Sequence, residues 1–472
     1  HEEAAASLEQ ALRLAPNAPY TLSHLVWTEI STCRWAGVEA RIDALRSKVR
    51  EGRVAAEPFI FVAVSADPEE QRLCAARHVR EKAPPRPALW QGVRYRHERI
   101  RVAYLSADFH EHATAQLAAG LFERHDRARF ELTALSYGPD DGSAMRRRLA
   151  GAFERFVDVR SRSDEEAARL LRELEVDIAV DLKGHTTGAR QAILARRPAP
   201  LQASYLGYPG TMGAPYVDYL IADRVVVPEA HQPFYSEKLV YLPDCYQVND
   251  AARPIAPRTP SRADAGLPAE GFVFCCFNNN FKILPPLFAV WMRLLGAVPG
   301  SVLWLLEDSA AVKRNLQAAA QAAGVAPGRL VFAPRLPPAE HLARHRLAGL
   351  FLDTLPYNAH TTASDALWAG LPLVTCAGSA FAGRVAASLL QAAGLGELAT
   401  SSLEEYEALA LRLARDPGAL GELRGRLAAG RTSAPLFDTD RFRRHIEAAY
   451  VTMWEAWQRG EPPRHFAVAA TG

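Results

Sequence analysis

Short apolar runs alternate with helical stretches over most of this chain, and the alternation limits its fold more than any other feature. Beyond residue 95, candidate strands fall into two sets separated by the loop 249–257. The sets are 100–105, 131–137, 177–182, 202–206, 219–222 and 239–242, then 272–277, 302–306, 330–332, 350–352 and 373–375. This rhythm predicts mostly parallel sheets covered by helices. We expect an α/β fold of two Rossmann-like units, with a ligand cleft between the carboxyl ends of their strands.

The first 85 residues differ in composition and are predicted to be all helix. They are rich in Ala, Leu, Glu and Arg and show helical periodicity. The stretch L-E-Q-A-L-R-L-A-P-N at 8–17 resembles the second helix and exit of a tetratricopeptide repeat, although an ordinary helical cap explains it equally well. Because the sequence begins with His1 and not Met, we expect a fragment of a longer chain.

These patterns predict four regions. Residues 1–85 form a tetratricopeptide-like region, 95–248 a first Rossmann-like domain, 258–435 a second, and 436–460 a helix that packs back on the core. A Pro-rich basic linker at 82–87 ends the helical region.

Composition describes a soluble protein of two or three domains. Among 472 residues, 49% are hydrophobic and 23% charged, and no apolar run is long enough to span a bilayer. The net charge of +2 provides no general attraction for nucleic acid. The six cysteines are scattered without a C-x-x-C pair, which favours reduced core residues and a cytoplasmic location.

One stretch predicts a phosphate site. The apolar run 350–356 is followed by His360-Thr361-Thr362-Ala363-Ser364-Asp365. Here a strand is followed by hydroxyl residues at the start of a helix. In such an arrangement the free backbone N–H groups and the positive end of the helix dipole point to one place, where an anion can bind. Asp365 shares a helical face with Thr361 and is suited to a ribose. In the alternative interpretation, Thr361 or Thr362 only caps the helix.

Four other polar clusters follow predicted strands. They are 106–112 with Asp108 and His112, 181–190 with His185, the glycine-rich 206–213, and 277–282 with Lys282. The histidines suggest a base or ligand, the glycines allow close backbone approach, and Lys282 is placed to meet a diphosphate. Incidental loop histidines, a turn-rich connection and a solvated lysine are the competing interpretations.

The tripeptide Asp438-Thr439-Asp440 matches the D-x-D pattern that holds a divalent ion in many sugar transferases. It also opens an amphipathic helix, and N-capping explains it better. We therefore assign no metal.

Taken together, the motifs resemble one family closely. They are S-x-D-F-x-x-H, G-A-R-x-x-x-x-x-x-R-P-A-P-x-Q, L-G-Y-P-G-T, F-N-N-N-F-K, V-L-W-L-L, E-H, H-T-T-x-x-D-x-L-W-A-G and R-V-A-A-S. Over about residues 90 to 460 the chain resembles the O-linked N-acetylglucosamine (O-GlcNAc) transferases, glycosyltransferase family 41. The resemblance implies tetratricopeptide repeats ahead of a GT-B region, in which 95–248 is the acceptor side and 258–435 binds the UDP-sugar. It also implies inverting, metal-independent transfer of GlcNAc from UDP-GlcNAc to Ser or Thr of proteins, with no cofactor.

The resemblance also assigns roles to residues. Lys282 corresponds to the lysine that binds the donor diphosphate and stabilises the leaving group, and His112 to a histidine once proposed as the general base. The expected UDP-binding residues are Asn279, Leu336, His341, Arg344, His360, Thr361, Thr362 and Asp365. The expected sugar and acceptor cleft residues are Asp108, His185, Tyr208, Pro209, Gly210, Thr211 and Tyr357.

The chain departs from the family pattern at three positions, of which the first two weaken donor binding and the third alters a wall beside the sugar. The resemblance therefore supports UDP-sugar binding more firmly than GlcNAc as the sugar. Asn279 stands where eukaryotic members have Gln, Pro338 where they have a ribose-contacting Lys, and Tyr357 where they have Cys. The alternatives are a UDP-glucose-dependent cytoplasmic protein N-glucosyltransferase, an enzyme like UDP-GlcNAc 2-epimerase, and a protein-binding scaffold with a vestigial donor site. The expected partners are a UDP-sugar and a protein or peptide acceptor held by the helical region, without nucleic acid or a membrane span.

Overall fold

The structure is a computed structural model that describes residues 2–470. By contacts the chain divides into two compact units, which we call unit 1 and unit 2. Unit 1 comprises the chain up to Ala56, Ile60–Asp67 and Arg253–Ala434, and unit 2 comprises Glu57–Phe59, Pro68–Ala252 and the chain from Pro435 onward. The helical region therefore contributes to both units, and the C-terminal segment returns to unit 2.

Within the described residues, unit 2 is built on an eight-stranded sheet of order β14-β7-β6-β5-β4-β1-β2-β3, and each strand pair is parallel. Its strands are β1 Ile100–Ser106, β2 Phe130–Ser136, β3 Arg155–Asp158, β4 Ile178–Asp181, β5 Leu201–Ser204, β6 Tyr219–Asp223, β7 Lys238–Leu242 and β14 Phe466–Ala467. The six strands predicted for this part of the chain are confirmed. The sequence patterns missed β3 and β14, because β3 is half exposed and polar at both ends, and β14 has two residues.

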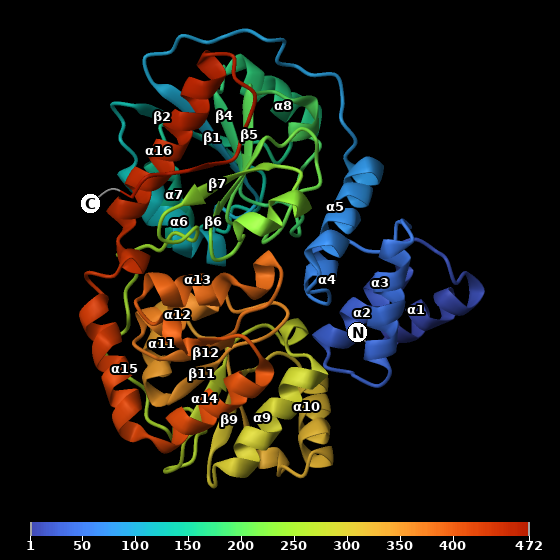
Figure 1. The fold of residues 1–472 in the computed structure, drawn as a ribbon, viewed down its shortest axis with the longest axis vertical. Coiled ribbons are helices and arrows are strands. Elements are labelled where there is room, and N and C mark those ends of the chain that lie inside the picture. Colours follow the sequence, from blue (N-terminus) through green and yellow to red (C-terminus); the bar gives the residue numbers. More distant parts are fainter. Residues whose placement is uncertain (1, 471–472) are drawn as a thin grey trace. The chain divides into compact units, whose positions relative to one another are not determined.

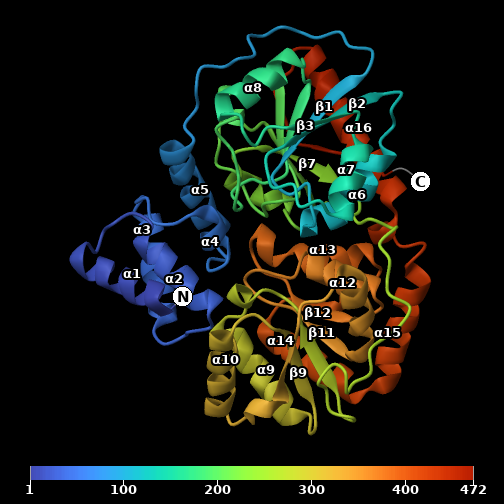
Figure 2. The same ribbon diagram turned by 180° about the vertical axis from the view of Figure 1, so that it is seen from behind.

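The helices of unit 2 lie around this sheet, and a long segment over 83–99 leads from α5 to β1 (Figure 2). They are α5 Pro68–Lys82, α6 Ala113–Arg124, α7 Ala144–Ala152, α8 Asp164–Glu173 and α16 Thr439–Gln458, with the short 3₁₀ helices η1 Leu194–Arg196, η2 Glu229–Phe234 and η8 Pro435–Phe437. Helix α8 begins with a capping box of Ser163 and Glu166.

Helix α16 runs along the eight-stranded sheet (Figure 1). It begins where the Asp438 side chain accepts a hydrogen bond from the Arg441 backbone N–H at 2.8 Å, which confirms the capping interpretation of the D-x-D tripeptide. On its buried face, the hydroxyl groups of Tyr450 and Tyr104 lie 2.9 Å apart. The Tyr104 hydroxyl also lies 2.9 Å from His125 Nε2, so a buried polar network links the helix to β1.

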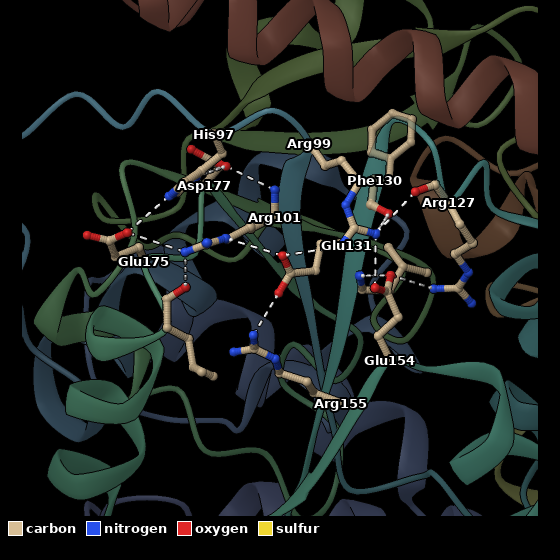
Figure 3. Close-up of polar contacts among 12 residues, drawn as sticks. His97, Arg99, Arg101, Arg127, Phe130, Glu131, Glu154, Arg155, Glu175 and Asp177 are labelled. Carbon is tan, nitrogen blue, oxygen red and sulfur yellow. Dashed lines mark hydrogen bonds and ion pairs between the residues drawn. The ribbon is translucent and has the colours of Figure 1, made fainter.

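The amino ends of β1, β2 and β4 are joined by a network of ion pairs (Figure 3). Arg101 on β1 lies 3.4 Å from Glu131 on β2 and 3.3 Å from Glu175. Asp177, just before β4, accepts a hydrogen bond from the Arg101 backbone N–H at 2.9 Å. These contacts tie together the end of the sheet opposite to the carboxyl ends, where the candidate site residues lie.

Unit 1 is built on a six-stranded sheet of order β10-β9-β8-β11-β12-β13 in the described chain, again with parallel pairs. Its strands are β8 Val273–Cys276, β9 Val302–Leu306, β10 Leu330–Ala333, β11 Leu350–Leu352, β12 Leu373–Cys376 and β13 Ala399–Thr400. All five strands predicted here are confirmed, and the two-residue β13 is an addition.

The helices of unit 1 come from both ends of the chain. Those of the C-terminal part are α9 Pro285–Ala297, α10 Ala310–Ala322, α11 Pro338–Arg344, α12 Thr361–Trp368, α13 Val385–Ala392, α14 Leu403–Arg415 and α15 Pro417–Gly430, with η3 Asn280–Lys282, η4 Pro327–Arg329, η5 His345–Leu347, η6 Phe381–Gly383 and η7 Gly396–Leu398. The N-terminal helices are α1 Glu2–Leu14, α2 Thr21–Ser31 and α3 Val38–Arg50, while α4 Pro58–Val62 is divided between the units.

Helix α2 packs directly on η3, since the ring of Trp27 lies 4.7 Å from that of Phe281. The Asn315 side chain on α10 also donates a hydrogen bond to the Thr32 carbonyl oxygen at 2.8 Å. The N-terminal helices therefore form part of unit 1 and do not stand apart from it.

All six cysteines are buried free thiols, as the sequence predicts. Among the helices of residues 2–470, none combines the length and apolar character that a membrane crossing requires.

Candidate functional site

Lys282 lies at the centre of the polar residues of unit 1. It follows β8 at the end of η3, and its side chain is nearly buried, at 9% exposure. Its ammonium group donates a hydrogen bond to the Asn358 carbonyl oxygen at 2.8 Å and lies 4.0 Å from the centre of the Tyr357 ring. The Tyr357 ring stacks in turn on His360 at 4.7 Å. These contacts exclude a solvated surface lysine, since the cation is held in place against an aromatic face.

A buried carboxylate organises the loop beneath Lys282. Asp353, directly after β11, accepts hydrogen bonds from the Thr375 hydroxyl at 2.6 Å and from the backbone N–H groups of Thr354 and Ala359 at 2.7 and 2.6 Å. Burial lowers the pKa of Lys282 and raises the pKa of Asp353, while the attraction between their charges opposes both shifts. A nearby anion would favour the charged form of Lys282.

Helix α12 begins beside this lysine. Its N-cap is His360, which makes no side-chain capping hydrogen bond in the described structure, and Thr361 is already the first helical residue. The capping interpretation of the two threonines is therefore wrong. The Thr362 hydroxyl donates instead to the Asn278 side chain at the end of β8. The first turn of α12 is thus without a side-chain cap, an arrangement suited to an anion.

His341 and Arg344 lie together on α11. The Arg344 guanidinium is buried, stacks over the Phe277 ring at 4.5 Å and donates to the Pro334 carbonyl oxygen and to His341 Nδ1. Burial, assisted by neighbouring cations, lowers the pKa of His341 to about 2, so this ring is neutral.

A cavity of about 500 Å³ adjoins Arg344. Leu336, which is partly exposed, lines it together with Trp304, Pro334 and Glu340, and the loop 256–265 contributes further lining residues. Flat aromatic and apolar walls beside one fixed cation suit a planar polar ring.

Asp365 is paired with a residue that the sequence analysis did not identify. Arg253, the first residue of the C-terminal segment of unit 1, donates from Nη1 to Asp365 Oδ1 at 2.6 Å, and both side chains are largely buried. The expected ribose-binding carboxylate is thus held by a cation 112 residues away in sequence.

Unit 2 contains a second polar cluster, after β1 and β4. The Lys183 ammonium group donates to both carboxylate oxygens of Asp108, at 2.9 and 2.8 Å, and both side chains are buried. His112 Nδ1 lies 3.5 Å from the same carboxylate and accepts a hydrogen bond from the Thr114 backbone N–H at 3.2 Å, where it caps α6. Because Nδ1 is the acceptor, the neutral ring carries its proton on Nε2.

His185 and Thr211 have structural partners. His185 Nε2 donates to the Met212 carbonyl oxygen at 2.8 Å, and burial lowers the pKa of its ring to about 3. The Thr211 hydroxyl donates to the Glu237 carboxylate at 2.7 Å. Tyr208 packs its ring edge-on against His185 at 4.9 Å. Pro209 and Gly210 lie between Tyr208 and Thr211 in the same loop.

Glycines hold the loops after β4 and β5 together. A β-carbon at Gly207 would lie 1.9 Å from the Leu182 carbonyl oxygen, and one at Gly184 would lie 2.3 Å from the Tyr208 β-carbon. Gly184 also has a φ of +58°. The close approach inferred from the glycine spacing is therefore an approach of one loop to the other.

The structure distributes the predicted residues over both units. Unit 1 contains Asn279, Lys282, Leu336, His341, Arg344, Tyr357, His360, Thr361, Thr362 and Asp365, and unit 2 contains Asp108, His112, His185 and 208–211. The sequence model of glycosyl transferase family 41 matches residues 73–258 and 251–446, and so covers parts of both units. This chain belongs to glycosyl transferase family 41.

Individual family 41 proteins show the same relationship. The chain is 40% identical over 377 residues to the Arabidopsis thaliana "Probable UDP-N-acetylglucosamine--peptide N-acetylglucosaminyltransferase SEC", covering 79% of this chain and 39% of that protein. It is 28% identical over 480 residues to the Caenorhabditis elegans UDP-N-acetylglucosamine--peptide N-acetylglucosaminyltransferase, covering 78% and 42% of the two chains. It thus spans about two fifths of the length of these curated relatives.

A solved structure extends the similarity to the fold. The chain matches an O-GlcNAc transferase mutant from Thermobaculum terrenum with a TM-score of 0.80 and 31% identity, over 97% of this chain and 88% of that one. Two Rossmann-like units and a helical N-terminal region are therefore the architecture of this family 41 chain, as expected for the GT-B class.

The sequence motifs do not single out three polar residues of this family 41 chain. Lys183 and Asp353 lie inside recognised motifs, and polar residues directly after buried strands were the signal that could have identified them. Arg253 lies in an irregular loop whose local sequence carries no such signal.

Proposed function

We propose that this chain transfers GlcNAc from UDP-GlcNAc to Ser or Thr hydroxyls of proteins, with inversion and without a metal ion. One observation supports this most strongly. A buried lysine, Lys282, lies beside the first turn of α12, which has no side-chain cap in the described structure. Breaking the bond between sugar and phosphate builds negative charge on UDP, and a fixed cation next to a helix N-terminus stabilises that charge.

The remaining contacts of UDP are proposed for the polar residues around α11 and α12. Thr361, Thr362 and Lys282 bind the diphosphate. Asp365 binds the ribose, and Arg344 and His341 contact the base. Arg344 remains a donor at every working pH, although burial lowers its pKa to about 10. Neutral His341 presents an aromatic ring without adding charge.

We assign His112 to positioning and not to proton removal. A neutral ring whose Nδ1 accepts from the Thr114 N–H presents Nε2 as a donor. A donor can hold an oxygen of the sugar or acceptor, but it cannot take a proton from the acceptor hydroxyl. Burial also lowers the pKa of His112, so the ring is neutral at neutral pH.

His112→Ala is therefore expected to slow transfer to protein and hydrolysis of the donor together. The acidic limb of the turnover–pH profile should survive, since it belongs to another group. The measurement is turnover between pH 5 and 9 with and without acceptor. Selective loss of the acidic limb, with hydrolysis spared, would establish His112 as the base instead.

The donor is expected to bind without a metal, because Lys282 supplies the positive charge that a metal ion would otherwise supply. Calorimetry should give the same UDP affinity in EDTA as in magnesium or manganese. A large loss of affinity in EDTA would contradict the proposed site.

The protein acceptor is proposed to meet the helical region. A pocket of about 250 Å³ lies where that region touches the loop that leads to Lys282, and its lining residues include Trp27, Ser31, Asn279 and Asp308. Amide, carboxylate and aromatic groups suit a peptide, whose backbone offers both donors and acceptors. A cytoplasmic location is part of the same proposal, and it agrees with the buried free thiols.

Incubation with radiolabelled UDP-GlcNAc and with radiolabelled UDP-glucose, each with and without host lysate, tests the proposal. Label from UDP-GlcNAc alone should enter protein, and base should release it from Ser or Thr. Preferential incorporation from UDP-glucose into Asn side chains would support N-glucosylation instead. No incorporation from either donor, while UDP still binds, would favour a scaffold.

A further inference from the structure

Arg253 is fixed at two points on helix α12. Its guanidinium Nη1 donates to Asp365 Oδ1 at 2.6 Å, and its carbonyl oxygen accepts a hydrogen bond from the Trp368 indole N–H at 3.2 Å. Asp365 and Trp368 are three residues apart, so they lie on one face of the helix. Both the backbone and the side chain of Arg253 are thus held to the helix that begins beside Lys282.

The guanidinium is buried with donors left over. The Arg253 side chain is 5% exposed, and its Nε and Nη2 atoms have no hydrogen-bond partner among residues 2–470. A guanidinium carries five N–H donors, and buried donors are nearly always satisfied in folded proteins. One ion pair with Asp365 therefore leaves a charged group incompletely paired.

Arg253 lies next to residues of the proposed nucleotide site. Its positive charge is one of those that disfavour protonation of His341 on α11. The unsatisfied donors thus lie in the same neighbourhood as the carboxylate of Asp365 and the ring of His341. Because Arg253 Nη1 lies 2.6 Å from Asp365 Oδ1, a ligand that contacted Asp365 would lie next to the Arg253 guanidinium.

We propose that Arg253 is a nucleotide-binding residue that grips the ribose diol together with Asp365. The inference rests on the proposed function and adds a residue to its donor site. A ribose hydroxyl is both donor and acceptor, so its O–H donates to the carboxylate while its oxygen accepts from the guanidinium. The guanidinium is planar and fixed, so little side-chain entropy is lost when the second contact forms.

A purely structural role predicts something different. If Arg253 only holds the segment before 256 against α12, its removal weakens the binding of every nucleotide equally, with or without ribose hydroxyls. If Arg253 contacts the diol, its removal weakens the binding only of nucleotides that carry those hydroxyls. The ratio of the two affinities therefore separates the roles.

Calorimetry with UDP and with 2′,3′-dideoxy-UDP measures this ratio. Wild-type protein should bind UDP more tightly by roughly 100-fold, and Arg253→Met should reduce that ratio by about tenfold or more, as expected for loss of a charge-assisted hydrogen bond. The matched control is Arg346→Met. Arg346 is exposed and donates to the Ala256 carbonyl oxygen of the same segment, so its loss loosens the segment without touching Asp365. The ratio of UDP affinity to dideoxy-UDP affinity for Arg346→Met should equal that of wild-type protein.

Arg253→Lys provides the second variant if the methionine variant does not fold, as judged by near-ultraviolet circular dichroism. A lysine keeps the charge beside Asp365 but lacks the planar fork, so the ratio should again fall by several-fold. An unchanged ratio in a folded Arg253 variant would overturn the inference while the proposed function stands. Failure of wild-type protein to bind UDP would overturn both.

Discussion

Lys282→Met is expected to lower the turnover of sugar transfer by about 100-fold or more, as for other preorganised groups that stabilise developing charge. Methionine fills the space of the lysine stem over the Tyr357 ring but carries no charge. Negative charge grows on the departing phosphate between the bound sugar nucleotide and the transition state, so turnover should fall more than affinity for intact UDP-GlcNAc.

Single-turnover kinetics and calorimetry with UDP-GlcNAc in the absence of acceptor, both on the same variant, separate the two effects. Lys313→Met is the matched control, because Lys313 also lies over an aromatic ring of unit 1, that of Phe332 at 5.5 Å, but is exposed. The control should keep wild-type turnover. A loss of less than about tenfold for Lys282→Met would assign the leaving-group role to another cation, with Arg344 the next candidate.

Gly207→Ala is expected to destabilise unit 2 by about 3 kcal/mol, because overpacked positions that cannot relax are among the most damaging. The new methyl group would lie 1.9 Å from the Leu182 carbonyl oxygen and 3.1 Å from the Lys183 α-carbon. Both atoms belong to the backbone, so no side chain can rotate away. The backbone shift needed to relieve this clash would also displace Lys183 from Asp108.

Urea unfolding followed by circular dichroism measures the loss. The control is Gly151→Ala on α7, where no described atom outside the adjacent residues and the helix's own backbone lies within 4 Å of the added carbon. Because alanine favours helix over glycine, this control should match or exceed wild type by up to about 1 kcal/mol. Equal stability of Gly207→Ala and wild type would show that the two loops separate readily.

The sequence predicted the sheets well because their strands are buried on both faces. Each of the eleven predicted strands is a short apolar run, and all are present. The three that were missed, β3, β13 and β14, are short or exposed, and their partners in the sheet hold them in place. Their own residues carry no strand signal. The division of the N-terminal helices between two units likewise depends on tertiary contacts and not on periodicity.

The residues of the candidate site were likewise predicted only in part. Lys282 and the threonines of α12 were identified because motif and strand end coincide in the sequence. Their partners were not, since Arg253 reaches Asp365 across 112 residues and Lys183 reaches Asp108 across 75. The sequence also left the N-cap of α12 open between the threonines, because neighbouring positions are equivalent until the backbone is known.

Mass spectrometry of the product tests the central claim most directly. Wild-type protein is incubated with UDP-GlcNAc and an acceptor protein from its host, with Lys282→Met beside it. We expect a single N-acetylhexosamine on Ser or Thr, removable by a β-N-acetylhexosaminidase because the donor's α-linkage is inverted, and nearly absent with Lys282→Met. A hexose on Asn, a product that resists the β-specific enzyme, or full modification by Lys282→Met would contradict this claim.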